Sequence, residues 1–508
     1  MKNKKIIKLL TAKNLSINLK KNKKKIALAH GVFDVLHIGH IKYFEDIKKK
    51  LPDSILFVTI TADKFVNKGP GRPMFTQMQR AEMLSQLNII DHVVIIEDFT
   101  AVPSIKNIKP HVYFKGNEYK NLSFDKNLKI EKRELKAYSS KIIYINTKKY
   151  SSSEIINNRF DNLDNSTKKF LKKINNNYNH NYITKLFETL KKLKVAVIGE
   201  AIIDEYIYVK PLNKSPKENL ITNLIESGES FLGGSLAVAN NIASFSQDVT
   251  IFSLLDENIQ NKLLLKKYFD KKIKKKIIFS RKYKTIKKTR FIESSYSTKK
   301  LFSLYEMKNT PLEREVENKI IKLLKTNLKK YDLIIVNDFG HEFFTNKITD
   351  VIVKYSKYLS LNVQTNSANM PFNPVTKYKK ANFVSIDIPE ARIASGDKYL
   401  SKLQMHNKIL KKSKFKNLIF TEGKNGSWYF KNNKAFNTPA FNDNVVDTMG
   451  AGDAFFSISS LIMKINQDVE LACFLGNIAG AIKTSILGHS KFINRQDFFK
   501  YVKTLMVK

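Results

Sequence analysis

The chain has 508 residues and one cysteine, and its 89 basic and 46 acidic side chains give a formal net charge of +43. This length predicts more than one domain, and an apolar fraction of 43% is enough for sizeable cores. The single cysteine, Cys473, excludes an internal disulfide and a metal site built from cysteines, and it favours a cytoplasmic location. No apolar run approaches the roughly 20 residues of a membrane span, so we expect no membrane-spanning segment.

The basic excess is spread along the whole chain and consists mostly of lysine beside abundant asparagine and isoleucine. This distribution favours a solvated surface, and we find no aromatic-interleaved basic block, zinc-finger spacing or helix-turn-helix pattern. A nucleic-acid-binding protein is therefore the less favoured alternative, and it would require steeply salt-dependent binding. A basic surface would also attract phosphorylated substrates.

A basic segment over residues 1–23 precedes the first element that can be predicted from the sequence. Residues 25–30 form a short apolar run typical of a buried parallel strand, and residues 41–50 repeat apolar side chains at helical spacing. Residues 31–40 therefore lie where a strand passes into a helix. Such a junction presents backbone N–H groups and the positive end of a helix dipole, which together suit a phosphate.

Two histidines in this junction point to a specific chemistry. His37 and His40 lie three residues apart with Gly39 between them, and a glycine leaves no Cβ to obstruct a ligand. Both imidazoles can donate hydrogen bonds to phosphate oxygens as charge develops. Positioning and electrostatic stabilisation then suffice for attack on an α-phosphate with pyrophosphate as the leaving group.

The motif Phe33-Asp34-x-x-His37-x-Gly39-His40 resembles the signature of the cytidylyltransferase-like nucleotidyltransferases. Three further family motifs follow in order, in residues 71–80, 114–119 and 150–156, so the resemblance covers residues 24–160. It implies a Rossmann-like domain that uses ATP or CTP, with His37 and His40 as catalytic residues. The nucleotide- and phosphate-binding residues that it implies are Phe33, Asp34, Gly39, Lys42, Arg72, Arg80, Gly116, Ser151, Ser152 and Ser153.

One departure concerns the last of these motifs. Relatives often carry an arginine before the serine-rich segment, whereas this chain has Lys148 and Lys149. A lysine supplies charge without the bidentate fork of an arginine.

Residues 161–190 are rich in asparagine and lysine, and we interpret them as a linker with a helix. A second domain over residues 191–508 begins with another strand-like run. Far along it, Gly450-Ala451-Gly452-Asp453 places small residues at a predicted helix start. Backbone N–H groups can converge there on an anion, and Asp453 can accept a proton from an attacking hydroxyl. By itself the motif could equally be a capped helix with an acid in its first turn.

Further motifs make this region resemble the ribokinase-like (PfkB) carbohydrate kinases over about residues 194–505. The resemblance implies a mostly parallel sheet covered by helices and a small β lid, with lid strands within residues 205–232 and 284–306. Asp453 would be the catalytic base, and Asp204, Gly233 and Gly234 would hold the sugar. Glu390 would organise Mg²⁺ indirectly. The residues implied on the ATP side are Thr421, Gly423, Gly426, Gly450, Ala451 and Gly452.

Three positions depart from this second family. Ala237 stands where relatives usually grip the sugar with asparagine, and Asp387 replaces a family asparagine. Residues 362–370 replace the segment in which sugar kinases commonly carry Asp-Pro. The base and the anion hole are retained, so we expect phosphoryl transfer with a changed acceptor pocket.

Together the two domains resemble the bifunctional heptose kinase/adenylyltransferases of lipopolysaccharide-core biosynthesis, in reversed order. We therefore expect a bifunctional transferase that makes an NDP-activated sugar or polyol for a surface glycan, a heptose among the candidates. The implied cofactors are Mg²⁺ at both sites, ATP for the kinase, and ATP or CTP for the nucleotidyltransferase. The expected partners are small molecules and a second copy bound through the kinase lid. The alternative is a nucleotidyltransferase whose kinase-like domain only binds a ligand or regulates.

Overall fold

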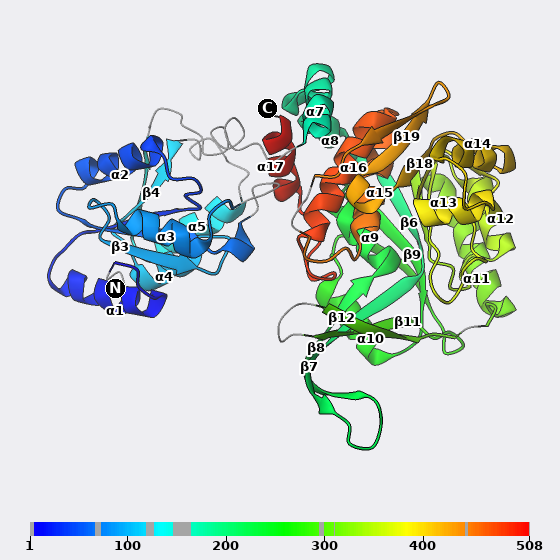
Figure 1. Ribbon diagram of the computed structural model, residues 1–508, viewed down its shortest axis with the longest axis horizontal. Helices are drawn as coiled ribbons and strands as arrows, with labels where there is room; N and C mark the ends of the chain where they lie inside the picture. Colours follow the sequence, from blue (N-terminus) through cyan, green and yellow to red (C-terminus); the bar gives the residue numbers. More distant parts are fainter. Residues whose placement is uncertain are drawn as a thin grey trace. The chain divides into compact units, whose positions relative to one another are not determined.

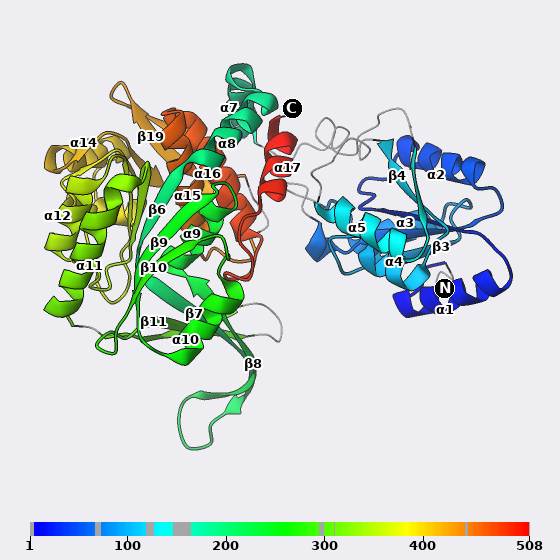
Figure 2. The same ribbon diagram turned by 180° about the vertical axis from the view of Figure 1, so that it is seen from behind.

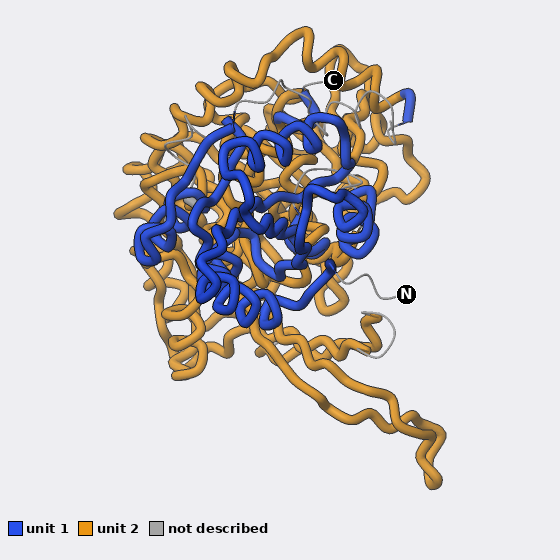
Figure 3. The backbone as a smooth tube through the Cα atoms, turned by 90° about the vertical axis from the view of Figure 1, so that its left-hand side faces the viewer, with its two compact units in different colours: residues 1–165, 503–508 blue, residues 166–502 orange. Residues whose placement is uncertain are grey.

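The structure of the protein is a computed structural model, and it describes residues 5–66, 73–117, 126–145, 164–293, 299–308, 310–441 and 445–506. The chain divides into two compact units, which Figure 3 colours separately. Unit 1 comprises residues 1–165 with 503–508, and unit 2 comprises residues 166–502.

Unit 1 is built on a five-stranded parallel sheet in the order β3-β2-β1-β4-β5. Its strands are β1 (Ile26–Gly31), β2 (Ile55–Thr61), β3 (His92–Ile96), β4 (Val112–Gly116) and β5 (Lys141–Ile145). They are rich in β-branched and aromatic residues, and all but the edge strand β5 are mostly buried, as expected of a covered parallel sheet.

Helices cover both faces of this sheet (Figures 1 and 2). Side chains of α2 (Ile38–Lys50) and α3 (Gln77–Ser85) pack in the core on one face. The other face is covered by α1 (Leu9–Lys21), α4 (Val102–Ile108) and α5 (Lys126–Ala137). Residues 1–23 therefore include a helix that packs on the sheet, with Ala12 fully buried.

Unit 2 is built on a nine-stranded sheet in the order β10-β9-β6-β13-β14-β16-β18-β19-β20. The sheet is parallel except at the β18–β19 and β19–β20 pairs. Its strands are β6 (Lys194–Gly199), β9 (Asp248–Leu255), β10 (Lys274–Phe279), β13 (Leu333–Asp338), β14 (Leu359–Val363), β16 (Phe383–Asp387), β18 (Leu418–Thr421), β19 (Ser427–Lys431) and β20 (Lys434–Thr438).

Helices also cover both faces of this larger sheet (Figure 1). One face carries α11 (Arg314–Asn327), α12 (Asn346–Tyr355), α13 (Ile388–Ser395) and α14 (Lys402–Lys412), which share a core with the strands. The other carries α9 (Gly234–Ala243), α15 (Ala451–Ile465) and α16 (Val469–Thr484). Further elements are α10 (Ile259–Tyr268), α17 (Arg495–Met506) and the short pair β15 (Lys380–Ala381) and β17 (Lys414–Phe415).

A separate four-stranded sheet in the order β12-β11-β7-β8 forms the lid. Its strands are β7 (Ala201–Lys214), β8 (Ile221–Gly233), β11 (Ile286–Glu293) and β12 (Lys299–Glu306). The end of the β7–β8 hairpin projects from the body of the unit as a long arm (Figure 1). The structure confirms the predicted fold. A Rossmann-like α/β unit is followed along the chain by an α/β unit with a ribokinase-like sheet and a small β lid.

The segment interpreted as a linker contains two helices, α7 (Asn165–Asn177) and α8 (His180–Thr189). Phe170 of α7 lies against Phe474, with ring centroids 6.1 Å apart. Phe187 of α8 is fully buried, and its ring centroid lies 5.3 Å from that of Phe245. Both helices therefore contribute apolar side chains to unit 2.

Candidate active sites

The candidate site of unit 1 lies at the point where the strand order reverses. β1 is the first strand of the sheet, and its neighbours β2 and β4 lead away from it in opposite directions. Ligands of open parallel sheets bind at such switch points, outside the carboxyl ends of the strands. Here those ends are Gly31 and Gly116, and α2 begins seven residues after Gly31.

His37 and His40 are brought together at the start of α2. His37 is the N-cap, and its ring stacks on that of His40 with centroids 3.9 Å apart. The ring of Phe33 meets the His40 ring edge-on, with 5.2 Å between centroids. Gly39 is buried between the histidines, while Lys42, two residues after His40 on the helix, is exposed.

Backbone hydrogen bonds define the tautomer of both imidazoles. The N–H of Gly39 donates to Nδ1 of His37 at 3.1 Å, and the N–H of His37 donates to Nδ1 of His40 at 3.4 Å. An Nδ1 that accepts a hydrogen bond carries no proton, so a neutral imidazole must carry its proton on Nε2. Each ring is thereby held as an Nε2–H donor, the form that hydrogen bonding to phosphate oxygens requires.

Asp34 and Arg80 support this loop from inside. Asp34 is fully buried and accepts hydrogen bonds from the backbone N–H groups of Met74 and Phe75 at 3.0 and 3.1 Å. Arg80 is also fully buried, and its guanidinium donates to the Val32 carbonyl at 2.5 Å. It also donates to the carbonyls of Thr61 and Phe75 and to the carboxylate of Asp63.

The structure therefore gives Arg80 a different environment from the one we predicted. Four hydrogen bonds to protein groups occupy its guanidinium, and none of its surface is exposed, so it connects three loops at the strand ends. Arg72, Ser151, Ser152 and Ser153 lie outside the described residues.

A histidine at the end of β1 escaped the sequence analysis. His30 lies 2.9 Å through Nδ1 from the Thr59 hydroxyl, and burial lowers the pKa of its imidazole to about 3. No spacing in the sequence distinguishes it, because it belongs to a strand whose pattern is otherwise apolar. Lys115, at the end of β4, belongs to the family motif in residues 114–119, and its ammonium lies 3.0 Å from the carboxylate of Glu131.

The candidate site of unit 2 is a pocket of about 300 Å³ between the lid and the carboxyl ends of the central strands. It brings together seven of the residues singled out in the sequence, namely Asp204, Gly234, Glu390, Thr421, Gly450, Gly452 and Asp453. Ala451 does not line it. Gly423 and Gly426 lie in the turn before β19, outside the pocket lining.

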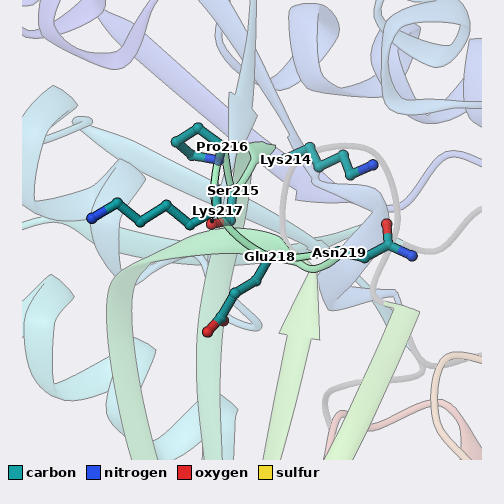
Figure 4. A pocket seen from close by; sticks show the side chains of 6 residues that line it. All are labelled: Lys214, Ser215, Pro216, Lys217, Glu218 and Asn219. Atoms are coloured by element: carbon teal, nitrogen blue, oxygen red, sulfur yellow. Dashed lines mark hydrogen bonds between the residues drawn. The ribbon is translucent and has the colours of Figure 1, made fainter.

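A second hollow, of about 440 Å³, shares no lining residue with this pocket. Six consecutive residues of the β7–β8 turn, 214–219, line it, and Figure 4 shows their side chains spread around the turn. All of them are exposed or nearly so, and no residue from another element contributes. We therefore assign no function to it.

Asp453 lies in the first turn of α15, directly after Gly452 and three residues after Gly450. Gly450 is the N-cap with φ 73°, in the left-handed region that favours glycine. A Cβ on Gly452 would meet no atom within 4 Å, so the helix N-terminus is open to an approaching group. This combination of open N–H groups and a helix dipole suits an anion.

The Asp453 carboxyl is buried, with only 7% of the residue exposed, and burial raises its pKa to about 6. Its Oδ1 accepts a hydrogen bond from Nε2 of Gln364 at 2.9 Å. A carboxylate with a pKa near the operating pH is an effective general base.

The lid supplies the opposite wall of the pocket. Asp204 accepts a hydrogen bond from Nη1 of Arg290 at 2.6 Å, and Nε2 of His489 lies 3.5 Å from its other oxygen. A Cβ on Gly233 would lie 2.0 Å from Asp204 Oδ2, so this position requires glycine. Gly234 has φ 59° and approaches the Glu200 carbonyl closely.

Lys288 and Arg290 were not identified from the sequence. They lie two residues apart on β11, so they point to the same face of the lid, and both line the pocket with 7% exposure. Burial lowers the pKa of Lys288, and the negative charge of Asp204 opposes this lowering. Because basic residues are so frequent in this chain, their alternation on one strand carried little information.

Asp387 and Glu390 lie together at the rim of the pocket and form a reciprocal cap of α13. Burial raises the pKa of both carboxyls. No group of three or more histidine, cysteine or acidic side chains suited to a metal occurs among the described residues. Mg²⁺, however, usually keeps several waters and needs only one or two carboxylates beside substrate phosphates, so this pair fits it.

No helix among the described residues is long and apolar enough to cross a membrane.

Comparisons with known proteins agree with this geometry. Residues 28–158 match the cytidylyltransferase-like family, and residues 371–492 match the pfkB family of carbohydrate kinases. The chain is 24% identical over 300 residues to the bifunctional protein HldE of Nitratiruptor sp., which covers 58% of this chain and 62% of that relative. The HldE of Aliarcobacter butzleri is 43% identical over 98 residues, 19% of this chain and 20% of that protein.

Among solved structures, phosphofructokinase-2 from Escherichia coli in complex with potassium superposes with a TM-score of 0.50 at 14% identity. It covers 62% of this chain and 99% of that structure, which shows a shared fold. The HldE matches span less than two thirds of those relatives' lengths. The chain thus contains a region that matches the cytidylyltransferase-like family and, after it, a region that matches the pfkB family of carbohydrate kinases, and both are transferase families.

Proposed function

We propose that this protein is a bifunctional transferase that activates a sugar for glycan synthesis. Unit 2 transfers a phosphoryl group from ATP to a hydroxyl of the sugar or its phosphate, and unit 1 condenses a sugar 1-phosphate with ATP or CTP. The observation that carries the proposal is the buried Asp453 carboxyl beside the open, glycine-lined start of α15.

In the kinase step, the Asp453 carboxylate accepts the proton of the attacking hydroxyl. The hydroxyl oxygen forms its bond to the γ-phosphorus of ATP as the bond to ADP breaks. The N-terminus of α15 stabilises the negative charge of the phosphoryl group in transit. Asp387 and Glu390 would hold Mg²⁺, which supplies positive charge to the ATP phosphates when bound.

Two cations on the acceptor side favour a phosphorylated sugar. Lys288 and Arg290 both face the pocket from β11; among the described residues, Arg290 pairs with the carboxylate of Asp204, whereas Lys288 forms no ion pair with a carboxylate. A second anionic group on the acceptor would satisfy Lys288 in an environment that otherwise disfavours its charge. Given the resemblance to heptose kinase/adenylyltransferases, a heptose phosphate is our leading candidate.

In the nucleotidyl step, a phosphate oxygen of the sugar 1-phosphate attacks the α-phosphorus of the nucleotide, and pyrophosphate leaves. His37 and His40 present Nε2–H donors at the start of α2, where charge develops on the phosphate oxygens. The stacked rings hold these donors in a fixed relation, so little reorganisation is needed during the reaction.

A panel assay tests the proposal. The purified protein is incubated with ATP or CTP, Mg²⁺ and a set of sugar 1-phosphates and polyol phosphates, and pyrophosphate release is measured. We expect release with one nucleotide and one acceptor class, and a loss of at least about a hundredfold in His40→Ala. Release that is unchanged in His40→Ala would contradict the assignment of the catalytic histidines.

A nucleotidyltransferase with a non-catalytic kinase-like unit is the second candidate. It is favoured by Ala237, which is completely buried in α9 and offers no polar group to a sugar. The intact Asp453 site argues against it, since a ligand-binding role would not require a buried base at the anion-binding helix end.

We further propose that the protein acts in the cytoplasm, where its nucleotide substrates are, and pairs with a second copy through the lid. Exposed apolar side chains on β12, Phe302 at 51% and Leu304 at 55%, motivate this pairing.

A further inference from the structure

The loop after β14 contributes a side chain that contacts the candidate base directly. Gln364 follows the last residue of β14, and its Nε2 lies 2.9 Å from Oδ1 of Asp453. The same Nε2 lies 2.7 Å from Oδ1 of Asn362. One amide group therefore donates to two oxygens, one of which belongs to the residue that takes the proton in the proposed kinase step.

The orientation of this amide is fixed by its surroundings. Nδ2 of Asn362 donates to the Ser385 carbonyl at 2.8 Å, so Oδ1 of Asn362 must face Gln364. The backbone of Gln364 is held as well: its N–H donates to the Asp338 carbonyl at 2.7 Å, and its carbonyl accepts from Asn373 at 2.9 Å. The N–H₂ end of Gln364 is thus directed at Asp453 by the fold.

These contacts constrain which oxygen of Asp453 can react. Hydrogen bonds from described residues to this carboxylate, from Gln364 and at 3.4 Å from Asn337, all go to Oδ1. Asp453 also lines the pocket, so its other oxygen, Oδ2, is the one available to an acceptor hydroxyl. A hydrogen bond to one oxygen fixes the carboxylate plane and with it the direction of the second oxygen.

The charges around Asp453 explain why a donor matters there. Burial raises its pKa to about 6, and the nearby carboxylate of Asp204 on β7 adds to this effect. Lys483 on α16 and Lys288 on β11 oppose it, and so does the hydrogen bond from Gln364. Asp387, Glu390, Arg290 and His489 line the same pocket. A donor to the ionised carboxylate favours its charged, proton-accepting form.

We infer that Gln364 is the positioning residue of the kinase base: its amide holds the Asp453 carboxylate with one oxygen directed at the acceptor hydroxyl. The inference rests on the proposed kinase activity. It gives a role to a residue in the loop that replaces the Asp-Pro segment expected of sugar kinases.

The test compares Gln364→Met and Gln364→Glu in the full-length protein. Methionine keeps the length of the side chain without the donor, and glutamate keeps its shape but places a second carboxyl beside Asp453. With ATP, Mg²⁺ and a heptose phosphate, the wild-type kcat should fall as the pH drops through about 6, because a protonated Asp453 accepts no proton. Gln364→Met should lower kcat about tenfold at pH 7.5 and move this limb up by about one pH unit, with KM for ATP unchanged. Gln364→Glu should move it further.

Thr365→Val is the matched control, because it changes the neighbouring residue of the same loop without touching Asp453. We expect its pH profile to follow the wild type. Equal profiles for wild type, Gln364→Met and Gln364→Glu in correctly folded proteins would overturn the inference.

A second measurement does not depend on the acceptor. In protein labelled with ¹³Cγ-aspartate, the signal that disappears in Asp453→Asn identifies the Asp453 carboxyl, and its titration midpoint should rise in Gln364→Met. A rise without any ADP release by the wild type would support the contact while rejecting the kinase activity. An unchanged midpoint would reject the role of Gln364, whatever the activity.

Discussion

At the scale of single residues, burial separates structural from reactive groups with the same charge. Arg80 and Lys42 were both expected to contact phosphate, yet Arg80 is fully buried and Lys42 is exposed. The guanidinium of Arg80 connects the carbonyls of Val32, Thr61 and Phe75. In the structure Arg80 links the loops that support the histidine site.

Replacing Arg80 should therefore destabilise unit 1 rather than weaken nucleotide binding selectively. Arg80→Met leaves buried carbonyls and Asp63 without their donor, which should cost about 3 kcal/mol or more. Hydrogen exchange followed by mass spectrometry should show faster exchange in peptides covering β1 and β2.

Lys42→Ala provides the comparison, with an expected change in stability within about 0.5 kcal/mol. If Arg80→Met raised KM for the nucleotide while exchange in β1 and β2 stayed the same, the structural assignment of Arg80 would be refuted.

The sequence alone identified candidate functional residues better than it predicted the surroundings of their side chains. The histidine motif and Asp453 stand out because glycines and predicted strand-to-helix junctions surround them. Arg80 looked like a phosphate ligand because nothing in the sequence reveals that its donors are used internally. Lys288 was missed because one buried lysine cannot be distinguished among so many exposed ones.

At the scale of elements, the strand register of the lid sheet shows which side chains lie on each of its two faces. Lys288 pairs with Asp204 across β11 and β7, so both side chains point to the pocket. On β12, Leu304 pairs with Thr289 and Phe302 with Phe291, so these residues belong to the opposite face. The lid thus combines a charged inner face with an outer face that exposes large apolar side chains.

The outer face of the lid should mediate the proposed homodimer. Phe302→Asp should convert a dimer into a monomer in light scattering at micromolar concentration, because a charge would have to be buried in the contact. Ile259→Lys is the matched control, since Ile259 is 73% exposed on α10, outside the lid. A wild-type protein with the mass of one chain would contradict the dimer.

The elements themselves were predicted with uneven success. The strands were predicted from apolar runs, and the two motif-bearing helices from the small residues at their starts. The spacing of the strands along the chain predicted parallel sheets. Asparagine and lysine dominate the sequence of α7, so its helical pattern is harder to recognise than that of α8, which is amphipathic. Their packing depends on a few residues such as Phe170 and Phe187, whose partners lie far along the chain.

At the scale of the whole molecule, two sites of different chemistry occur on one chain. Both lie at the carboxyl ends of parallel strands, and both use a helix N-terminus, α2 in unit 1 and α15 in unit 2. The residues assigned to the first site belong to unit 1, and those assigned to the second belong to unit 2. The two proposed reactions should therefore be separable by single substitutions.

The most direct test of this account measures both reactions in both site variants. ADP release is assayed with ATP, Mg²⁺ and a sugar phosphate, and pyrophosphate release with a sugar 1-phosphate and ATP or CTP. We predict that Asp453→Asn loses ADP release by about a hundredfold or more and keeps pyrophosphate release, whereas His40→Ala does the reverse. If each variant kept the reaction of its own site, or if each variant lost both reactions, the account of two independent catalytic sites would be contradicted.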